Sequence, residues 1–145
     1  MSLLDVRELS VDYLAGGAAL HAVEGVSFAL EEGRSLGIVG ESGCGKTTVM
    51  LSLLRLLPQN GRIVGGQILF EGQDLLRLTE AQMRCVRWHR ISMVFQGAMN
   101  ALNPVRTIES QIVEALQVHG VASSARAAKR RAGELLERFD LVDAA

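Results

Sequence analysis

The sequence predicts a composite α/β domain rather than a plain doubly wound sheet. Three observations support this fold class. Several β segments precede a glycine-rich loop, a short apolar strand and a helix flank that loop, and the chain after a second apolar strand is helical. With 145 residues, 48% hydrophobic content and a net charge of −1, the chain has enough apolar side chains for one domain with a mostly aliphatic core.

The composition also excludes several classes of protein. A near-neutral charge balance argues against a nucleic-acid-binding protein that relies on bulk charge. Cys44 lies in the glycine-rich loop and Cys85 is far from it, so we expect no disulfide framework and a reducing compartment. The three histidines form no zinc-like cluster with them. We expect no signal peptide, and no apolar stretch reaches the roughly 20 residues that span a bilayer.

The first elements are β segments separated by turn signals. Residues 3–14 alternate apolar and polar side chains, which is typical of a half-buried strand or two. A turn at 15–18 leads to a second strand region at 22–30. After the central loop and helix, residues 62–70 form another β segment, whose glycines indicate a bend or a bulge.

The central stretch, residues 36–58, has the order strand, loop, helix. The apolar run 36–39 predicts a buried strand, and the loop that follows fits the pattern G-x-x-x-x-G-K-[ST]. The helix is expected to begin near Lys46 and to continue to Leu57, where Pro58 stops it. This context distinguishes a phosphate-binding loop from a chance match.

The residue types of the loop suit a triphosphate. Glycines allow main-chain N–H groups to converge on an anion, and the start of the helix adds further N–H groups and its positive dipole end. The Lys46 ammonium can reach the β- and γ-phosphates, the Thr47 hydroxyl can bind Mg²⁺, and the Thr48 hydroxyl can bond a phosphate nearer the sugar. The alternative is a glycine-rich turn that binds nothing. The candidate phosphate-binding residues are Gly40, Glu41, Ser42, Gly43, Cys44, Gly45, Lys46, Thr47 and Thr48.

The part of the chain after residue 70 is expected to be mostly helical. Thr79 and Gln82 resemble a capping box for a helix at 80–88, and the apolar run 91–95 predicts a strand that ends at Gln96. Helices are expected at 107–119 and 125–139. The basic residues of the last helix fit a solvated face better than a nucleic-acid patch; they are Arg126, Lys129, Arg130 and Arg131.

These residues together resemble a known family. The segments AVEGVSFALEEGRSLGIVGESG, GESGCGKTT and ISMVFQGAMNALNPV, and the spacing from Tyr13 to Lys46, are similar to the N-terminal half of an ABC transporter ATPase subunit. The resemblance is strongest to the peptide and nickel (oligopeptide and dipeptide) importer group. It implies a P-loop NTPase fold, with an ABC-type ATPase core and an antiparallel β subdomain in residues 1–105 and the start of a helical subdomain in 106–145.

The resemblance also implies residue roles. Tyr13 would stack on adenine, although an aromatic residue on an alternating strand is otherwise a packing or surface residue. Gln96 would contact Mg²⁺ and the attacking water and sense the γ-phosphate, although it could be a simple loop residue. Lys46 and Gln96 are thus the candidate catalytic residues, Thr47 and Gln96 the candidate metal ligands, and ATP and Mg²⁺ the expected cofactors. Cys44 is read as a spacer in the loop rather than a reactive thiol.

Partners follow from the same resemblance. The loop from Gly97 to Pro104 would lie near the contact with a transmembrane permease. A second ATPase subunit, identical or paralogous, would complete each ATP site, and an extracytoplasmic solute-binding protein would act indirectly. No nucleic-acid partner is expected. The protein would lie at the cytoplasmic face of the cell membrane, attached through the permease, and its cargo would be peptides or nickel.

The 145 residues lack other motifs of that family. They contain no LSGGQ-like signature and no apolar run ending in Asp-Glu, so the chain is expected to be truncated and, alone, inactive in hydrolysis. Two alternatives stay open: a truncated nucleotide-binding module without hydrolysis, and an ABC ATPase outside transport. A kinase or GTPase is disfavoured because no guanine-recognition motif is present and too many strands precede the loop.

Overall fold

The computed structural model describes residues 2–95 and 102–138 of the chain. It divides into two compact units, residues 1–84 and 85–145, which are treated separately below. Gln96 and most of the expected permease-contact loop at 97–104 lie outside the described residues. The same is true of Phe139, the expected end of the last helix.

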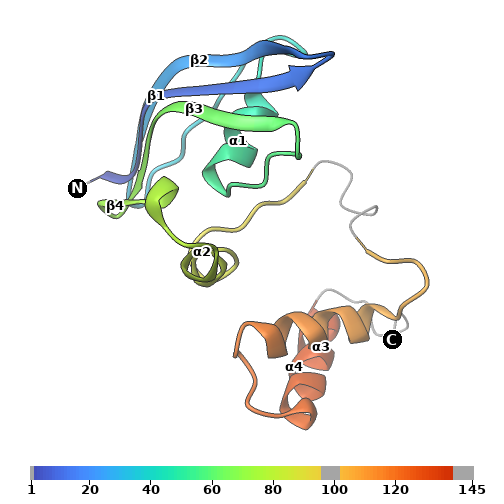
Figure 1. Ribbon diagram of the computed structural model, residues 1–145. Helices are drawn as coiled ribbons and strands as arrows, with labels where there is room; N and C mark the ends of the chain where they lie inside the picture. Colours follow the sequence, from blue (N-terminus) through green and yellow to red (C-terminus); the bar gives the residue numbers. More distant parts are fainter. Residues whose placement is uncertain (1, 96–101, 139–145) are drawn as a thin grey trace. The chain divides into compact units, whose positions relative to one another are not determined.

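The first unit is organised around an antiparallel sheet (Figure 1). Its strands are β1 (Ser2–Ala15), β2 (Ala18–Glu31), β3 (Gly61–Phe70) and β4 (Gln73–Asp74), in the spatial order β2-β1-β3-β4. A two-residue turn at Gly16 and Gly17 joins β1 to β2. The three predicted β segments are therefore confirmed, and residues 2–15 form one strand rather than two.

A bulge in β1 explains the spacing of its buried residues. Between Val6 and Leu9 the strand has one residue more than its partners β2 and β3, and Glu8 has a positive φ of 49°. The bulge returns Leu9 to the face that Val6 occupies, and both are buried. Opposite it, a Cβ at Gly66 would lie 2.5 Å from the carbonyl oxygens of Arg7 and Glu8, so this crossing tolerates only glycine.

The helix after the glycine-rich loop packs against this sheet. α1 (Lys46–Leu53) buries Val49, Ser52 and Leu53, and Figure 1 shows it along one face of the strands. The buried strand residues on that side are Val6, Leu9, Val11, Val23, Ile68 and Phe70. This contact holds the start of α1 at a fixed place on the sheet.

α1 starts where the sequence predicts but ends earlier. Leu56 N donates to Leu51 O and Arg55 N donates to Ser52 O, at 2.9 and 3.0 Å, which is the hydrogen-bond pattern of a Schellman motif. Arg55 takes the left-handed conformation with φ 52°, and its guanidinium donates to Leu75 O and Leu78 O. The prediction that the helix reaches Leu57 is wrong because these contacts end it four residues sooner.

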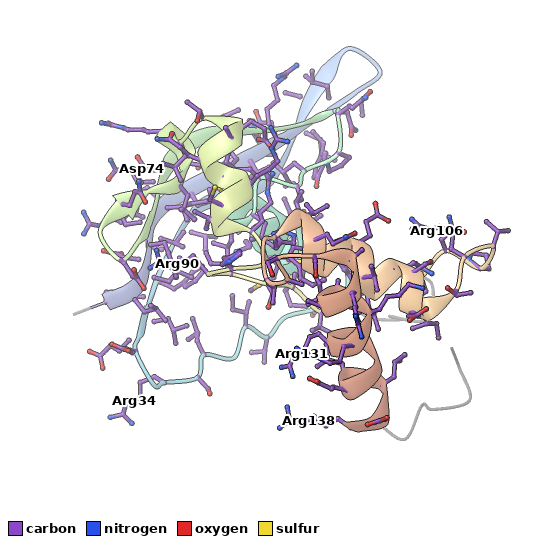
Figure 2. The ribbon with its side chains drawn as sticks, turned by 90° about the horizontal axis from the view of Figure 1, so that it is seen from below. Arg34, Asp74, Arg90, Arg106, Arg131 and Arg138 are labelled. Atoms are coloured by element: carbon purple, nitrogen blue, oxygen red, sulfur yellow. The ribbon has the colours of Figure 1, made fainter. Side chains whose placement is uncertain are left out.

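The chain then forms a short turn and a helix. η1 (Leu75–Arg77) is capped by the Asp74 side chain, which accepts from Leu76 N, and Asp74 also pairs with Arg77 (Figure 2). α2 (Glu80–Val86) begins at the predicted capping box, since Gln82 Oε1 accepts from Thr79 N at 2.8 Å and Thr79 Oγ1 accepts from Gln82 N. The helix ends two residues before the expected Trp88.

The second unit contains two confirmed helices. α3 (Ile108–Val118) is capped by Thr107, whose hydroxyl accepts from Ser110 N, and α4 (Ala125–Arg138) buries a stripe of small and aliphatic residues, Ala128, Ala132 and Leu136. Its basic residues include Arg130 and Arg131, which pair with Glu134 on the helix surface (Figure 2). This arrangement agrees with a solvated face.

Two predicted strands are not formed. Residues 34–41 are extended without strand pairing, and in the run 36–39 Leu36 and Val39 are 46% and 93% exposed. In the run 91–95, only Ile91 takes part in an isolated bridge, with Arg87, and Val94 is 89% exposed. A strand buried on both faces needs neighbouring strands and covering helices, and the described part of the chain supplies neither to these runs.

No helix in the described ranges 2–95 and 102–138 is both long and apolar enough to cross a membrane.

Candidate functional site

The start of α1 is held against β2 by a close backbone contact. Gly45, which precedes the helix, has φ 92°, and a Cβ there would lie 2.6 Å from Ala22 O and 3.2 Å from a Val23 methyl group. Ala22 is an extra residue in β2, because Val11 pairs with Val23 while Asp12 pairs with His21. The bulge brings the Ala22 carbonyl to the loop, so the sheet directly positions the end of α1.

The first turn of α1 presents unpaired main-chain donors. The initial N–H groups of any α-helix lack an intrahelical partner and carry the positive end of the dipole. Here they belong to the first residues from Lys46 onward, directly after the loop. Residues 41–44 are exposed, and a Cβ at Gly40 would lie 2.6 Å from Cys44 Sγ. The loop is therefore a narrow, accessible turn that suits an anion.

The Lys46 side chain lies within the loop. Its Nζ donates to Gly40 O at 2.7 Å and to Glu41 O at 2.6 Å, and lies 3.4 Å from Cys44 Sγ. The loop backbone therefore folds around the Lys46 ammonium group. A phosphate that approached the loop would meet both this charge and the helix terminus, which are arranged on the same side of the turn.

Tyr13 joins the same site from the sheet. Its hydroxyl lies 3.4 Å from Thr48 Oγ1, and Thr48 is a buried residue in the first turn of α1. On its other side, a Cβ at Gly61 would lie 2.8 Å from Tyr13 Cε1, so the ring occupies the space that a side chain there would fill. The structure therefore brings together three of the expected residues, Tyr13, Lys46 and Thr48, within the first unit.

Of the two expected metal ligands, Thr47 and Gln96, only Thr47 belongs to the described residues. The Thr47 hydroxyl lies on the exposed side of the first turn of α1. Across residues 2–95 and 102–138, no three His, Cys, Asp or Glu side chains are close enough to hold a metal ion. One hydroxyl fits Mg²⁺ bound mainly by substrate phosphates and water, which is how that ion is commonly held. Gln96 cannot be placed relative to it.

A hydrogen-bonded histidine–aspartate pair lies on the opposite face of the hairpin. His21 Nδ1 lies 2.7 Å from Asp12 Oδ1, and the two residues are cross-strand partners. The hydrogen bond to Asp12 and the charge of Asp12 raise the pKa of His21 above its ordinary value. Neighbouring residues of a strand face opposite ways, so this pair is separated from the Tyr13 face by the sheet.

The sequence gives no signal for one feature of the site. The Ala22 bulge that seats Gly45 lies in a run of ordinary strand residues. It depends on the register between β1 and β2.

A hollow of about 760 Å³ lies in the second unit. Aliphatic and aromatic side chains of α3 and α4, together with Trp88, form most of its lining, and Trp88 stacks on His119 with ring centroids 5.4 Å apart. Among the described residues, its lining has no lysine or arginine and no glycine-rich turn. This hollow therefore does not suit a triphosphate, in contrast to the loop at α1.

Comparisons with known proteins identify the family. The family profile described as ABC transporter matches residues 23–145. A probable peptide ABC transporter ATP-binding protein of Sinorhizobium fredii is 48% identical over 142 residues, which is 97% of this chain and 42% of the relative. An oligopeptide transport ATP-binding protein of Bacillus subtilis is 43% identical over 93% of this chain and 38% of its own length. The chain thus spans about two-fifths of the length of these relatives.

The fold is also found in solved structures. A dimeric ATP-binding cassette, solved in a post-hydrolysis state bound to ADP and Pi, matches with a TM-score of 0.76 and 23% identity over 92% of this chain and 56% of that one. The ABC-type fold expected from the sequence is therefore confirmed. Together with the family match, these similarities show that the chain belongs to the ABC transporter family.

Proposed function

We propose that this chain binds Mg-ATP at the loop and first turn of α1. The single observation that carries the proposal is the position of the Lys46 ammonium, which is hydrogen-bonded inside the loop directly before a helix start that the sheet holds in place. The free N–H groups and the dipole of such a terminus favour anion binding, and the Lys46 ammonium adds a positive charge.

Each site residue has a proposed role. The loop from Gly40 to Gly45 wraps the phosphates, and Lys46 exchanges its two carbonyl partners for phosphate oxygens. Thr47 contributes a ligand to Mg²⁺, which supplies positive charge beside the phosphates when bound. Tyr13 stacks on the adenine ring. Gln96 positions the attacking water and senses the γ-phosphate; this role rests on its place in the sequence alone.

For the whole protein, we propose an energy-coupling subunit of an ABC importer for peptides. The similar proteins of Sinorhizobium fredii and Bacillus subtilis are described as peptide and oligopeptide transport ATP-binding proteins, which supports peptides over nickel as the cargo. The proposed partners are permease subunits, contacted near residues 97–104, a second ATPase subunit, and indirectly a solute-binding protein. The protein would lie peripherally at the cytoplasmic face of the membrane. The division into a core at 1–105 and a helical subdomain from 106 stays a prediction.

Hydrolysis by these 145 residues alone is not expected. Phosphoryl transfer needs a group that orients the attacking water and acidic residues that complete the metal site, and the sequence contains no apolar run that ends in Asp-Glu. We therefore propose nucleotide binding without measurable phosphate release for the isolated chain. Phosphate release from Mg-ATP that disappears in Lys46→Ala would contradict this part of the proposal.

Binding is tested by titrating Mg-ATP into the protein and into lysine variants, by calorimetry. The chain holds two lysines, Lys46 in the loop and Lys129 in α4, so each variant removes one of them. Lys46→Ala should weaken binding about 100-fold, because a charge-assisted contact to phosphate is lost. Lys129→Ala should leave the affinity unchanged. Equal affinities of the two variants would reject the site.

A further inference from the structure

The hollow in the second unit brings together two histidines that are far apart in the sequence. The ring centroids of His89 and His119 are 5.9 Å apart, and the ring planes are tilted by 56°. His89 follows α2, whereas His119 directly follows the last residue of α3. Two imidazoles that bind one ion, each through a nitrogen at about 2.1 Å, have their ring centres about 4.5–6.5 Å apart. The observed separation therefore suits an ion shared by the two rings.

The surroundings of the two rings leave their nitrogens available. His119 stacks on Trp88 with 24° between the ring planes, and a metal ion binds at the edge of an imidazole rather than on its face. Among the described residues, neither imidazole is hydrogen-bonded to another protein group, whereas the third histidine, His21, is bonded to Asp12. A neutral imidazole always has one acceptor nitrogen, so each ring can offer a lone pair to a cation.

The rest of the lining offers no better ligand. Most of its side chains are aliphatic, and the indole of Trp88 is a donor only. The amide of Gln111 is bound to the backbone before α3, because its Oε1 accepts from Asn103 N at 2.9 Å and its Nε2 donates to Asn103 O at 3.1 Å. Of the described lining residues, His89 and His119 are therefore the best placed to bind a cation.

We propose that His89 and His119 bind one divalent transition-metal ion, with water completing its coordination. Imidazole is a preferred ligand of Ni²⁺, Cu²⁺ and Zn²⁺, whereas Mg²⁺ and Ca²⁺ prefer oxygen ligands. Residues 2–95 and 102–138 contain no group of three His, Cys, Asp or Glu side chains that could hold a metal, so this site has two protein ligands and binds the ion reversibly. The ion links the segment after α2 to the end of α3, and the site is separate from the phosphate loop.

The single tryptophan of the chain reports on this site. Trp88 stacks on His119 with ring centroids 5.4 Å apart, so Ni²⁺ bound to His119 lies close enough to quench the indole fluorescence. Titration of the parent protein with NiCl₂ should therefore quench the fluorescence of Trp88 to a saturating level. Excess Zn²⁺, which has a filled d shell and does not quench, should restore the fluorescence by displacing Ni²⁺.

Four variants identify the ligands. His89→Ala and His119→Phe, which keeps an aromatic ring against Trp88, should each weaken Ni²⁺ binding at least about tenfold, since even the loss of a group that only supports a metal ligand costs that much. His21→Ala should leave the quenching curve unchanged. Cys85→Ser, which removes the thiol nearest to His89 in the sequence, should also leave it unchanged. Circular dichroism checks that each variant keeps its helices.

The titration needs no nucleotide, so its outcome does not depend on the proposed function. A parent without saturable quenching would overturn the inference. Equal quenching in the parent and His89→Ala, or quenching that is lost only in Cys85→Ser, would assign the Ni²⁺ to another group and overturn it as well. Weaker binding in both His89→Ala and His119→Phe, with the other two variants unchanged, supports the site.

Discussion

The long strands of the sheet and the apolar runs at 36–39 and 91–95 have similar aliphatic sequences, yet only the long strands are paired. β1 and β2 are joined by a two-residue turn, so each is the other's nearest partner along the chain. The two runs read as strands buried on both faces, which need parallel neighbours brought from distant parts of a chain. The difference shows that an apolar run is buried as a strand only where paired strands and a covering helix are present, as they are for β1, β2 and β3.

The same difference divides the candidate site. On one side, Tyr13 of β1 contacts Thr48 of α1 at 3.4 Å, and Gly45 lies so close to β2 that a Cβ there would be 2.6 Å from Ala22 O. On the other side, residues 34–41 are largely exposed and have no strand pairing, and only Gly40 and Glu41 at their end bind the Lys46 ammonium group. The sheet therefore positions the start of α1, while the Lys46 side chain is positioned by the carbonyl groups at the beginning of the loop.

The largest expected effect concerns the bulge of the sheet. Gly66→Val places a side chain 2.5 Å from two carbonyl oxygens at a φ of 92° and should reduce the free energy of unfolding by at least about 3 kcal/mol. Gly72→Val is the control, since Gly72 has a similar φ of 81° but open space around it, and should cost about 1–2 kcal/mol. Urea unfolding measures both. Equal losses would mean that the close crossing of β1 and β3 is absent.

A smaller effect compares two valines. Val11→Ala in β1 removes two methyl groups from a fully buried side chain and should lower the free energy of unfolding by about 2 kcal/mol. Val39→Ala, at a side chain that is 93% exposed, should change it by less than about 0.5 kcal/mol. Urea unfolding of both variants measures these changes. A loss of unfolding free energy at Val39 as large as that at Val11 would show that the run 36–39 is a packed strand.

The smallest effect is the pH dependence of the His21–Asp12 pair on the far face of the hairpin. Because the pKa of His21 is raised by Asp12, the pair stabilises the fold fully below about pH 6.5, and this contribution is lost as the pH rises through the raised pKa. Asp12→Asn should return the pKa of His21 towards its ordinary value. A proton NMR titration of His21 measures this directly, and an unchanged midpoint in the variant would exclude the pairing.

Many of the confirmed features of the fold follow from local sequence signals. The alternation in residues 3–14, the Thr79–Gln82 capping box and the start of α1 at Lys46 are set by neighbouring residues, and all three predictions are confirmed. The end of α1 is not local, because Arg55 is held by carbonyls of Leu75 and Leu78, about twenty residues further on. No sequence pattern within the helix predicts such a distant hydrogen-bond partner.

The candidate site likewise has features that local sequence predicts and features that depend on distant contacts. The loop and its lysine could be read from the motif, because phosphate binding needs those residue types at that spacing. The contacts of Tyr13 with Thr48 and of Ala22 with Gly45 depend on strand register, a bulge and the placement of α1, which the sequence does not encode in adjacent residues. The roles of these residues in nucleotide binding stay predictions.

The central claim is that the base lies on the β1–β2 hairpin while the phosphates lie on the loop. Photolabelling with 8-azido-ATP, followed by mass spectrometry of the peptides, tests it most directly. The adduct should fall on the hairpin peptide that contains Tyr13, and excess ATP or Lys46→Ala should abolish it. An adduct that ATP displaces but that lies only in residues 102–138 would contradict the account.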